Sequence, residues 1–176
     1  MGKTGGGRGT NQYAVQGVSQ TTRQDAAVLD DLAAGEPQVM WRTGGTKEWR
    51  LKNGDLHRTD GPAVERADGT KQWYANGRLH RTDGPAIEWA DGTKEWFVNG
   101  ERHRTDGPAI ELSDGIKQWY VNGQRHRTDG PAIEYANGSM VWFADGDLHR
   151  TDGPAVELAS GRREWWVNGR QVSPPA

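Results

Sequence analysis

The chain has 176 residues, enough for one ordinary domain or one short repeat array, and only 33% of them are hydrophobic. Its 22 basic and 24 acidic residues leave a net charge of −2, so no overall electrostatic field favours nucleic acid or an anionic membrane as a partner. The chain contains no cysteine, which excludes a disulfide framework, thiolate zinc sites and a cysteine nucleophile.

The first segment, residues 1–20, is rich in glycine and has no hydrophobic periodicity, which predicts a flexible arm. It has no apolar stretch of the signal-peptide kind, and no run in the chain approaches the roughly 18 apolar residues of a membrane span. Gly2-Lys3-Thr4 lacks the glycine, strand and helix that surround a phosphate-binding loop, so we expect no nucleotide or other cofactor. We expect a protein that is cytoplasmic when made and has no membrane partner.

A short amphipathic helix with a linker is predicted for residues 21–36. The helix runs from Thr22 to Ala34, and Gly35 followed by Pro37 ends it. Its apolar side chains share one side and are Val28, Leu29 and Leu32. A helix of about 12 residues is marginal alone, so we expect it to dock on the sheet or on a partner.

Residues 37–170 are a repeat array with a period of 23 residues. One mark of the repeat is the heptapeptide His-Arg-Thr-Asp-Gly-Pro-Ala, which begins at His57, His80, His103, His126 and His149. A second mark is a tryptophan that recurs at Trp49, Trp73, Trp96, Trp119, Trp142 and Trp165. The array begins with a partial copy and ends before a proline-containing tail at residues 171–176.

Each repeat contains the hairpin signals Asp-Gly and Asn-Gly between short runs of strand-forming residues. The pattern predicts an all-β fold: an elongated single-layer antiparallel meander of about six 23-residue hairpin repeats, preceded by the flexible arm and the short helix. If both turns are two-residue loops, Ile110 lies opposite Trp119 and Trp119 lies opposite His126. One face would then carry the Ile, Trp and His rows, and the opposite, more polar face would carry Ala109, Glu111, Gln118, Tyr120 and Arg125.

The recurring tryptophans and histidines are interpreted as the structural core of the repeat: Trp73, Trp96, Trp119, Trp142, His80, His103, His126 and His149. Pairs such as His57 with Asp60 also fit a catalytic or metal site, because a carboxylate can orient an imidazole. A catalytic site needs unlike groups that converge on one place, whereas the repeat spaces like groups evenly. We therefore expect no metal, no catalytic residue and no enzymatic activity.

A row of aromatic residues is expected on the more polar face, with Leu56, Leu79, Arg102, Arg125 and Leu148 across from it. Amphipathic anchors of this kind are typical of interfaces, so the row predicts a protein-binding stripe, although the Trp and His face remains an alternative. The stripe comprises Tyr74, Phe97, Tyr120, Phe143, Trp166, Arg102 and Arg125. Aromatics between arginines could also stack on single-stranded nucleic acid, but neighbouring acidic residues offset each arginine, so nucleic acid is not predicted.

The unit Asn-Gly-x-x-His-Arg-x-Asp-Gly-Pro-Ala resembles the MORN (membrane occupation and recognition nexus) type of β-hairpin repeat, in particular its divergent bacterial and phage forms. The resemblance covers residues 39–170. It implies an elongated sheet used for scaffolding or protein binding, with a function that depends on the partner.

The leading interpretation is a non-enzymatic scaffold in a large, multimeric assembly such as a phage virion. The arm would be anchored in the shell or tail, and the repeat domain would be displayed. The alternative is an immunity, antitoxin or anti-defence protein that blocks an enzyme through the repeat face. The partner in either case is a protein.

Overall fold

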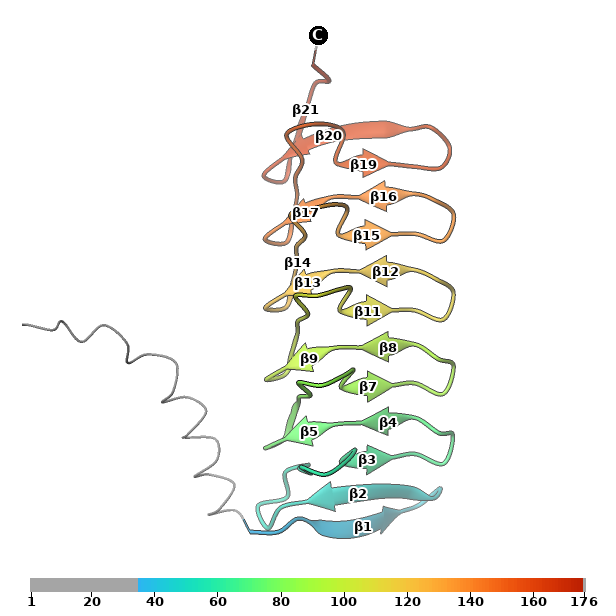
Figure 1. The fold of residues 1–176 in the computed structure, drawn as a ribbon, viewed down its shortest axis with the longest axis vertical. Helices are drawn as coiled ribbons and strands as arrows, with labels where there is room; N and C mark the ends of the chain where they lie inside the picture. The colour runs from blue at the N-terminus through green and yellow to red at the C-terminus, as the bar shows by residue number, and fades with distance from the viewer. Residues whose placement is uncertain (1–34, 176) are drawn as a thin grey trace, which may run out of the picture. The chain divides into compact units, whose positions relative to one another are not determined.

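In a computed structural model of the protein, residues 35–175 are described, and they form a single layer of short antiparallel β-strands (Figure 1). This part of the chain contains no helix, and the sheet is open rather than closed into a barrel. The all-β meander predicted from the repeat is therefore confirmed. The predicted arm and the predicted helix between Thr22 and Ala34 lie outside the described residues, as does Ala176.

One half of every repeat belongs to a sheet of thirteen strands, in which each strand pairs with its neighbour in the antiparallel sense. In spatial order these strands are β1 (Gln38–Arg42), β2 (Thr46–Arg50), β3 (Val64–Glu65), β4 (Lys71–Gln72), β7 (Ile87–Glu88), β8 (Lys94–Glu95), β11 (Ile110–Glu111), β12 (Lys117–Gln118), β15 (Ile133–Glu134), β16 (Met140–Val141), β19 (Val156–Glu157), β20 (Arg163–Val167) and β21 (Arg170–Val172). Figure 1 shows their hairpins stacked in chain order along the long axis of the array.

The other half of each central repeat is a small two-stranded hairpin. These hairpins are β5 (Tyr74–Ala75) with β6 (Arg78–Leu79), β9 (Phe97–Val98) with β10 (Glu101–Arg102), β13 (Tyr120–Val121) with β14 (Gln124–Arg125), and β17 (Phe143–Ala144) with β18 (Asp147–Leu148). Backbone hydrogen bonds join neighbouring hairpins: Gly100 N–H donates to the Leu79 carbonyl at 2.8 Å, and Arg81 N–H donates to the Phe97 carbonyl at 3.2 Å. The repeats are thus hydrogen-bonded to one another in both halves.

The Asn-Gly turn is a two-residue loop, as predicted. Val121 pairs with Gln124, and His126 N–H donates to the Trp119 carbonyl at 3.2 Å. Asn122 has φ 49° and Gly123 has φ 77°, the positive values that a type I′ turn requires at both central positions. The expected placement of Trp119 opposite His126 is confirmed.

The predicted register across the Asp-Gly turn is wrong by one residue. Ile110 pairs with Gln118, and not with Trp119. The loop has three residues, closed by the bond from Leu112 N–H to the Ile116 carbonyl at 2.9 Å, and only its glycine, at position 115 with φ 91°, is left-handed. Because side chains alternate along a strand, this slip moves the isoleucine to the opposite face from Trp119.

The larger aliphatic side chains are therefore buried on the face that was expected to be the more polar one, while the fully buried Ala109 pairs with Trp96. A row of paired positions crosses the sheet there and consists of Val64, Gln72, Ile87, Glu95, Ile110, Gln118, Ile133, Val141, Val156 and Glu164. Ile110 is only 7% exposed, and burying such a side chain contributes about 1.5–3 kcal/mol relative to leaving it in water. Ile110 packs in one cluster with Tyr120, so the apolar row and the aromatic row support each other.

Candidate functional site

The arginine of the His-Arg-Thr-Asp-Gly-Pro-Ala connector lies over the ring of a tryptophan on the same face. In the central repeat, the Arg104 guanidinium carbon is 4.0 Å from the centroid of the Trp96 ring. Its Nε donates to Asp106 at 2.9 Å, and its Nη1 donates to the Pro108 carbonyl at 3.1 Å and to Glu111 at 3.0 Å. The same arrangement recurs at Arg58, Arg81, Arg127 and Arg150.

The connector glycine leaves room for this arginine. A Cβ on Gly107 would stand 2.9 Å from the Arg104 guanidinium carbon, and the φ of Gly107 is not positive, so space rather than backbone conformation requires glycine here. The guanidinium is held between the indole on one side and the glycine backbone on the other. Sequence reasoning did not single out this arginine, although an arginine at the same place in all five connectors was the available signal.

The aspartate of each connector is an exposed acid with a perturbed pKa. The hydrogen bond from Arg104 and its positive charge hold the pKa of Asp106 below its ordinary value. The same cause lowers the pKa of Asp60, Asp83, Asp129 and Asp152. These carboxylates therefore stay ionised and keep the arginine oriented over its tryptophan.

The connector histidine joins one repeat to the next. The backbone N–H of Asn122 donates to Nδ1 of His103 at 3.2 Å, and the equivalent bond recurs at each of the other four histidines. Nδ1 of His103, His126 and His149 also lies 2.8–3.0 Å from Oδ1 of the same turn residue. The histidines are buried or half-buried, as are Trp73, Trp96, Trp119 and Trp142, so this set packs within the array.

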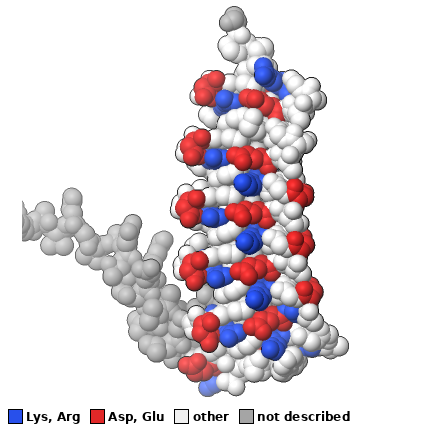
Figure 2. Space-filling view, turned by 45° about the vertical axis from the view of Figure 1, so that its right-hand side comes forward, with Lys and Arg blue, Asp and Glu red and all other residues white. Residues whose placement is uncertain are grey.

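The Trp and Arg face also carries alternating charges. Glu65, Glu88 and Glu111 each pair with a lysine on both sides, for example Glu111 with Lys94 and Lys117. Glu134 pairs with Lys117 on one side and Met140 on the other. Figure 2 shows acidic and basic side chains alternating in rows along this face. The alternation neutralises the surface locally, so it offers no strong attraction to a partner of either charge.

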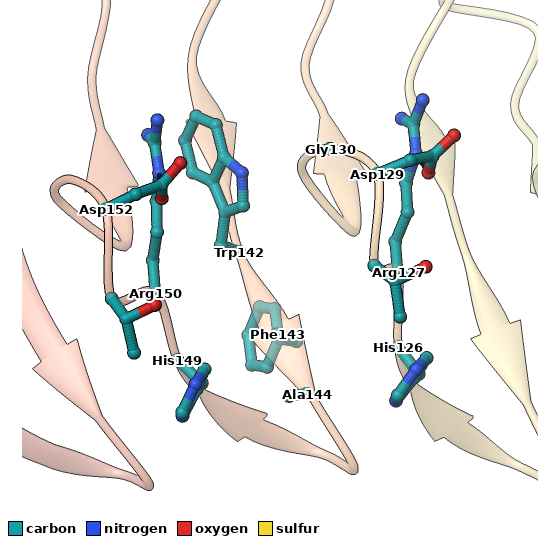
Figure 3. A pocket seen from close by; sticks show the side chains of 12 residues that line it. His126, Arg127, Asp129, Gly130, Trp142, Phe143, Ala144, His149, Arg150 and Asp152 are labelled. Carbon is teal, nitrogen blue, oxygen red and sulfur yellow. Dashed lines mark hydrogen bonds and ion pairs between the residues drawn. The ribbon is translucent and has the colours of Figure 1, made fainter.

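Shallow grooves lie between three pairs of neighbouring connectors on this face. One has a volume of about 710 Å³ and lies between the His126 and His149 connectors, with Trp142 and Ala144 also lining it (Figure 3). Equivalent grooves of about 490 and 460 Å³ lie one and two repeats earlier. The arginine and aspartate side chains that line the grooves are already bonded to each other. The grooves therefore offer threonine hydroxyls, and few uncompensated charges, to a ligand.

The predicted binding stripe is one continuous row on the core face. Phe97 and Tyr120 are each 8% exposed, whereas Tyr74, Phe143 and Trp166 are half-buried. Tyr120 Oη donates to Gln118 at 3.1 Å, and burial raises the pKa of the Tyr74 hydroxyl. The aromatic rings thus serve the core as well as the surface.

The two arginines of the stripe differ in their surroundings. Arg102 is bound through two nitrogens to Glu95, at 3.0 and 2.9 Å, so its charge is compensated. Arg125 lies 5.6 Å from the Tyr120 ring centroid and 5.5 Å from that of Phe143, and its guanidinium has no ion-pair or hydrogen-bond partner among the described residues. Its Nε is buried without an acceptor. The position equivalent to Glu95 in this repeat is the neutral Gln118.

Comparison with known proteins found no protein-family model and no curated protein that matches the chain. Within residues 35–175, no helix is long and apolar enough to cross a membrane. No group of three or more histidine, aspartate or glutamate side chains in this range could hold a metal ion.

Proposed function

We propose that this protein is a binding scaffold that presents the aromatic stripe to a protein partner, as a component of a large assembly such as a phage virion. In this proposal residues 1–20 anchor the chain, and the repeat array is displayed. The resemblance of the repeat to MORN-type repeats supports a scaffold role.

Arg125 is the observation that carries the proposal. An arginine held between two aromatic rings, with no carboxylate beside it, is an anchor of the type that dominates protein interfaces. A partner that placed a carboxylate against the guanidinium would supply the missing counter-charge and two charge-assisted hydrogen bonds. We therefore expect the partner to present an acidic residue flanked by apolar surface.

The alternative function is that of an immunity, antitoxin or anti-defence protein that binds and blocks an enzyme. The uncompensated arginine occurs in a single repeat, and such a localised anchor suits one compact partner. The two functions use the same stripe, and the identity of the partner distinguishes them.

The experiment is recovery of partners from the native source with the tagged wild type and three variants. Arg125→Ala removes the anchor, and Gln118→Glu places a carboxylate where Glu95 stands in the preceding repeat, so Arg125 would be neutralised from within. We expect both variants to lose at least about tenfold in partner binding, or about 1.4 kcal/mol. The control, Gln124→Glu, adds the same charge at the exposed first position of β14 and should bind normally.

Recovery with mature particles would support the assembly function, and recovery of one enzyme at equal stoichiometry would support the alternative. Normal partner binding by both Arg125→Ala and Gln118→Glu would show that the stripe is not the binding surface.

A further inference from the structure

The first strand of the array has an open edge. β1 is terminal in the strand order and pairs only with β2 among the described strands. All five of its residues are exposed, and three of them are large and apolar: Val39 at 51%, Met40 at 44% and Trp41 at 67%. Unpaired edge strands with apolar side chains readily pair with another strand, and proteins usually protect them.

The backbone groups that face outward from β1 can be identified from its partner. Val39 lies opposite Trp49, and both the N–H and the carbonyl of Trp49 bond away from β1, to Ala63 and His57. Val39 and Trp49 are thus a non-hydrogen-bonded pair, and the N–H and carbonyl of Val39 point away from β2. Because the direction alternates along a strand, Trp41 also presents its backbone groups outward, whereas Met40 does not.

We propose that β1 pairs with β1 of a second copy of this chain, in the antiparallel sense and about a two-fold axis at Met40. In this register Val39 lies opposite Trp41 of the second copy, and Met40 lies opposite Met40. The two Val39 and Trp41 pairs are the positions with outward backbone groups, so each pair exchanges two hydrogen bonds. Gln38 then faces Arg42, and no like charges oppose each other.

The neighbouring registers satisfy these groups less well. Centring the axis on Val39 would place Trp41 opposite Pro37, which has no N–H to donate. Centring it on Trp41 would place Val39 opposite Thr43, which lies in the turn after β1. The Met40 register alone uses every outward group of the strand, and it aligns two aromatic and β-branched pairs on one face.

The opposite end of the array supports the choice of β1. There β21 is followed directly by Ser173, Pro174 and Pro175, and prolines cannot extend a ladder of hydrogen bonds. β1 contains no proline, and its single charged side chain, Arg42, is bonded to Glu48 of its own hairpin. The edge at β21 is therefore short and is followed by prolines, whereas β1 offers a longer edge without proline.

The absence of native cysteine makes the register testable by cross-linking. Residues that face each other in a non-hydrogen-bonded pair have Cα atoms about 4.5 Å apart, which is within disulfide range. We expect full-length Met40→Cys to form a disulfide-linked dimer on mild oxidation. Val39→Cys alone and the control Val172→Cys, at the other edge, should remain largely uncross-linked, whereas mixing Val39→Cys with Trp41→Cys should produce mixed dimers.

Sedimentation equilibrium of the cysteine-free chain tests the association itself. We expect concentration-dependent dimers that Trp41→Lys weakens at least tenfold, and that Tyr135→Lys, a similar change at an exposed residue away from β1, leaves intact. A wild type that stays monomeric throughout would overturn the proposal, as would equal cross-linking at positions 40 and 172. Dimers that appear only after removal of residues 1–34 would also overturn it, because the edge would then be unavailable in the intact chain.

Discussion

The sandwich of Arg104 between Trp96 and Gly107 leads to a prediction about coupling between two substitutions. In the wild type, Gly107→Ala places a methyl group 2.9 Å from the guanidinium carbon, which is closer than real Cβ contacts allow. The guanidinium must leave the indole and the Pro108 carbonyl. The lost cation–π contact is worth about 1–2 kcal/mol and the hydrogen bond about 1 kcal/mol, so we expect a net destabilisation of about 2 kcal/mol.

The same substitution should have the opposite sign when Arg104 is absent. In Arg104→Ala the space beside Gly107 is empty, and the φ of Gly107 is not positive. Replacing glycine by alanine at a compatible position stabilises by about 0.4–1 kcal/mol, because the unfolded chain loses freedom. The two substitutions should thus show a coupling free energy of about 2 kcal/mol or more.

Urea unfolding of the four proteins, followed by tryptophan fluorescence, measures this coupling. Gly138→Ala provides the control, because its φ of 84° makes alanine unfavourable for backbone reasons and no side chain lies within 4 Å. Its cost should be the same with and without Arg104, to within about 0.5 kcal/mol. An equal cost of Gly107→Ala in both backgrounds would refute the sandwich.

Two further predictions concern acid and turn geometry. The pKa of Asp106 and of its four equivalents is lowered in the folded protein. The ionised carboxylates therefore add to the free energy of unfolding above the unfolded pKa of about 3.9, and this contribution is lost as pH falls through the folded pKa. The urea midpoint should therefore fall between about pH 5 and pH 3, and Asp106→Asn should make the fall shallower; a midpoint independent of pH would contradict this. At the Asn-Gly turn, Asn122→Gly should be nearly neutral and Asn122→Ala should cost about 1 kcal/mol, because φ is 49° there; equal thermal stability of the two variants would argue against the positive φ.

The repeat, its period and the Asn-Gly loop could be predicted from sequence because Asn122-Gly123 strongly favours positive φ at both positions. Asp114-Gly115 was ambiguous, since Asp-Gly also fits a three-residue loop in which only glycine is left-handed. In the structure Asp114 instead accepts a hydrogen bond from Ile116 N–H at 3.1 Å. The loop is one residue longer than predicted, and this difference places Ile110 on the opposite face of the sheet.

The arginine and tryptophan pairing was harder to predict, because a regular repeat shows its period but not which strand positions meet. The sequence spacing from Arg104 to Trp96 and the spacing to Trp119 both recur in every repeat, so the spacing does not tell which ring the arginine contacts. The strand register decides that it lies over Trp96. Gln118 was correctly expected on the same face as Tyr120 and Arg125, but the bond between Arg102 and Glu95, which has no counterpart at Arg125, was not predicted.

The bond from each turn N–H to the histidine nineteen residues earlier makes every repeat boundary chemically alike. A unit could therefore be duplicated or deleted without creating a new kind of contact. Each unit adds two strands to the main sheet, or about 9.6 Å along the array. The number of repeats therefore sets the length of the stripe, which spans four units, or about 38 Å, from Tyr74 to Trp166. Gain or loss of one repeat in the gene would change this length by one unit.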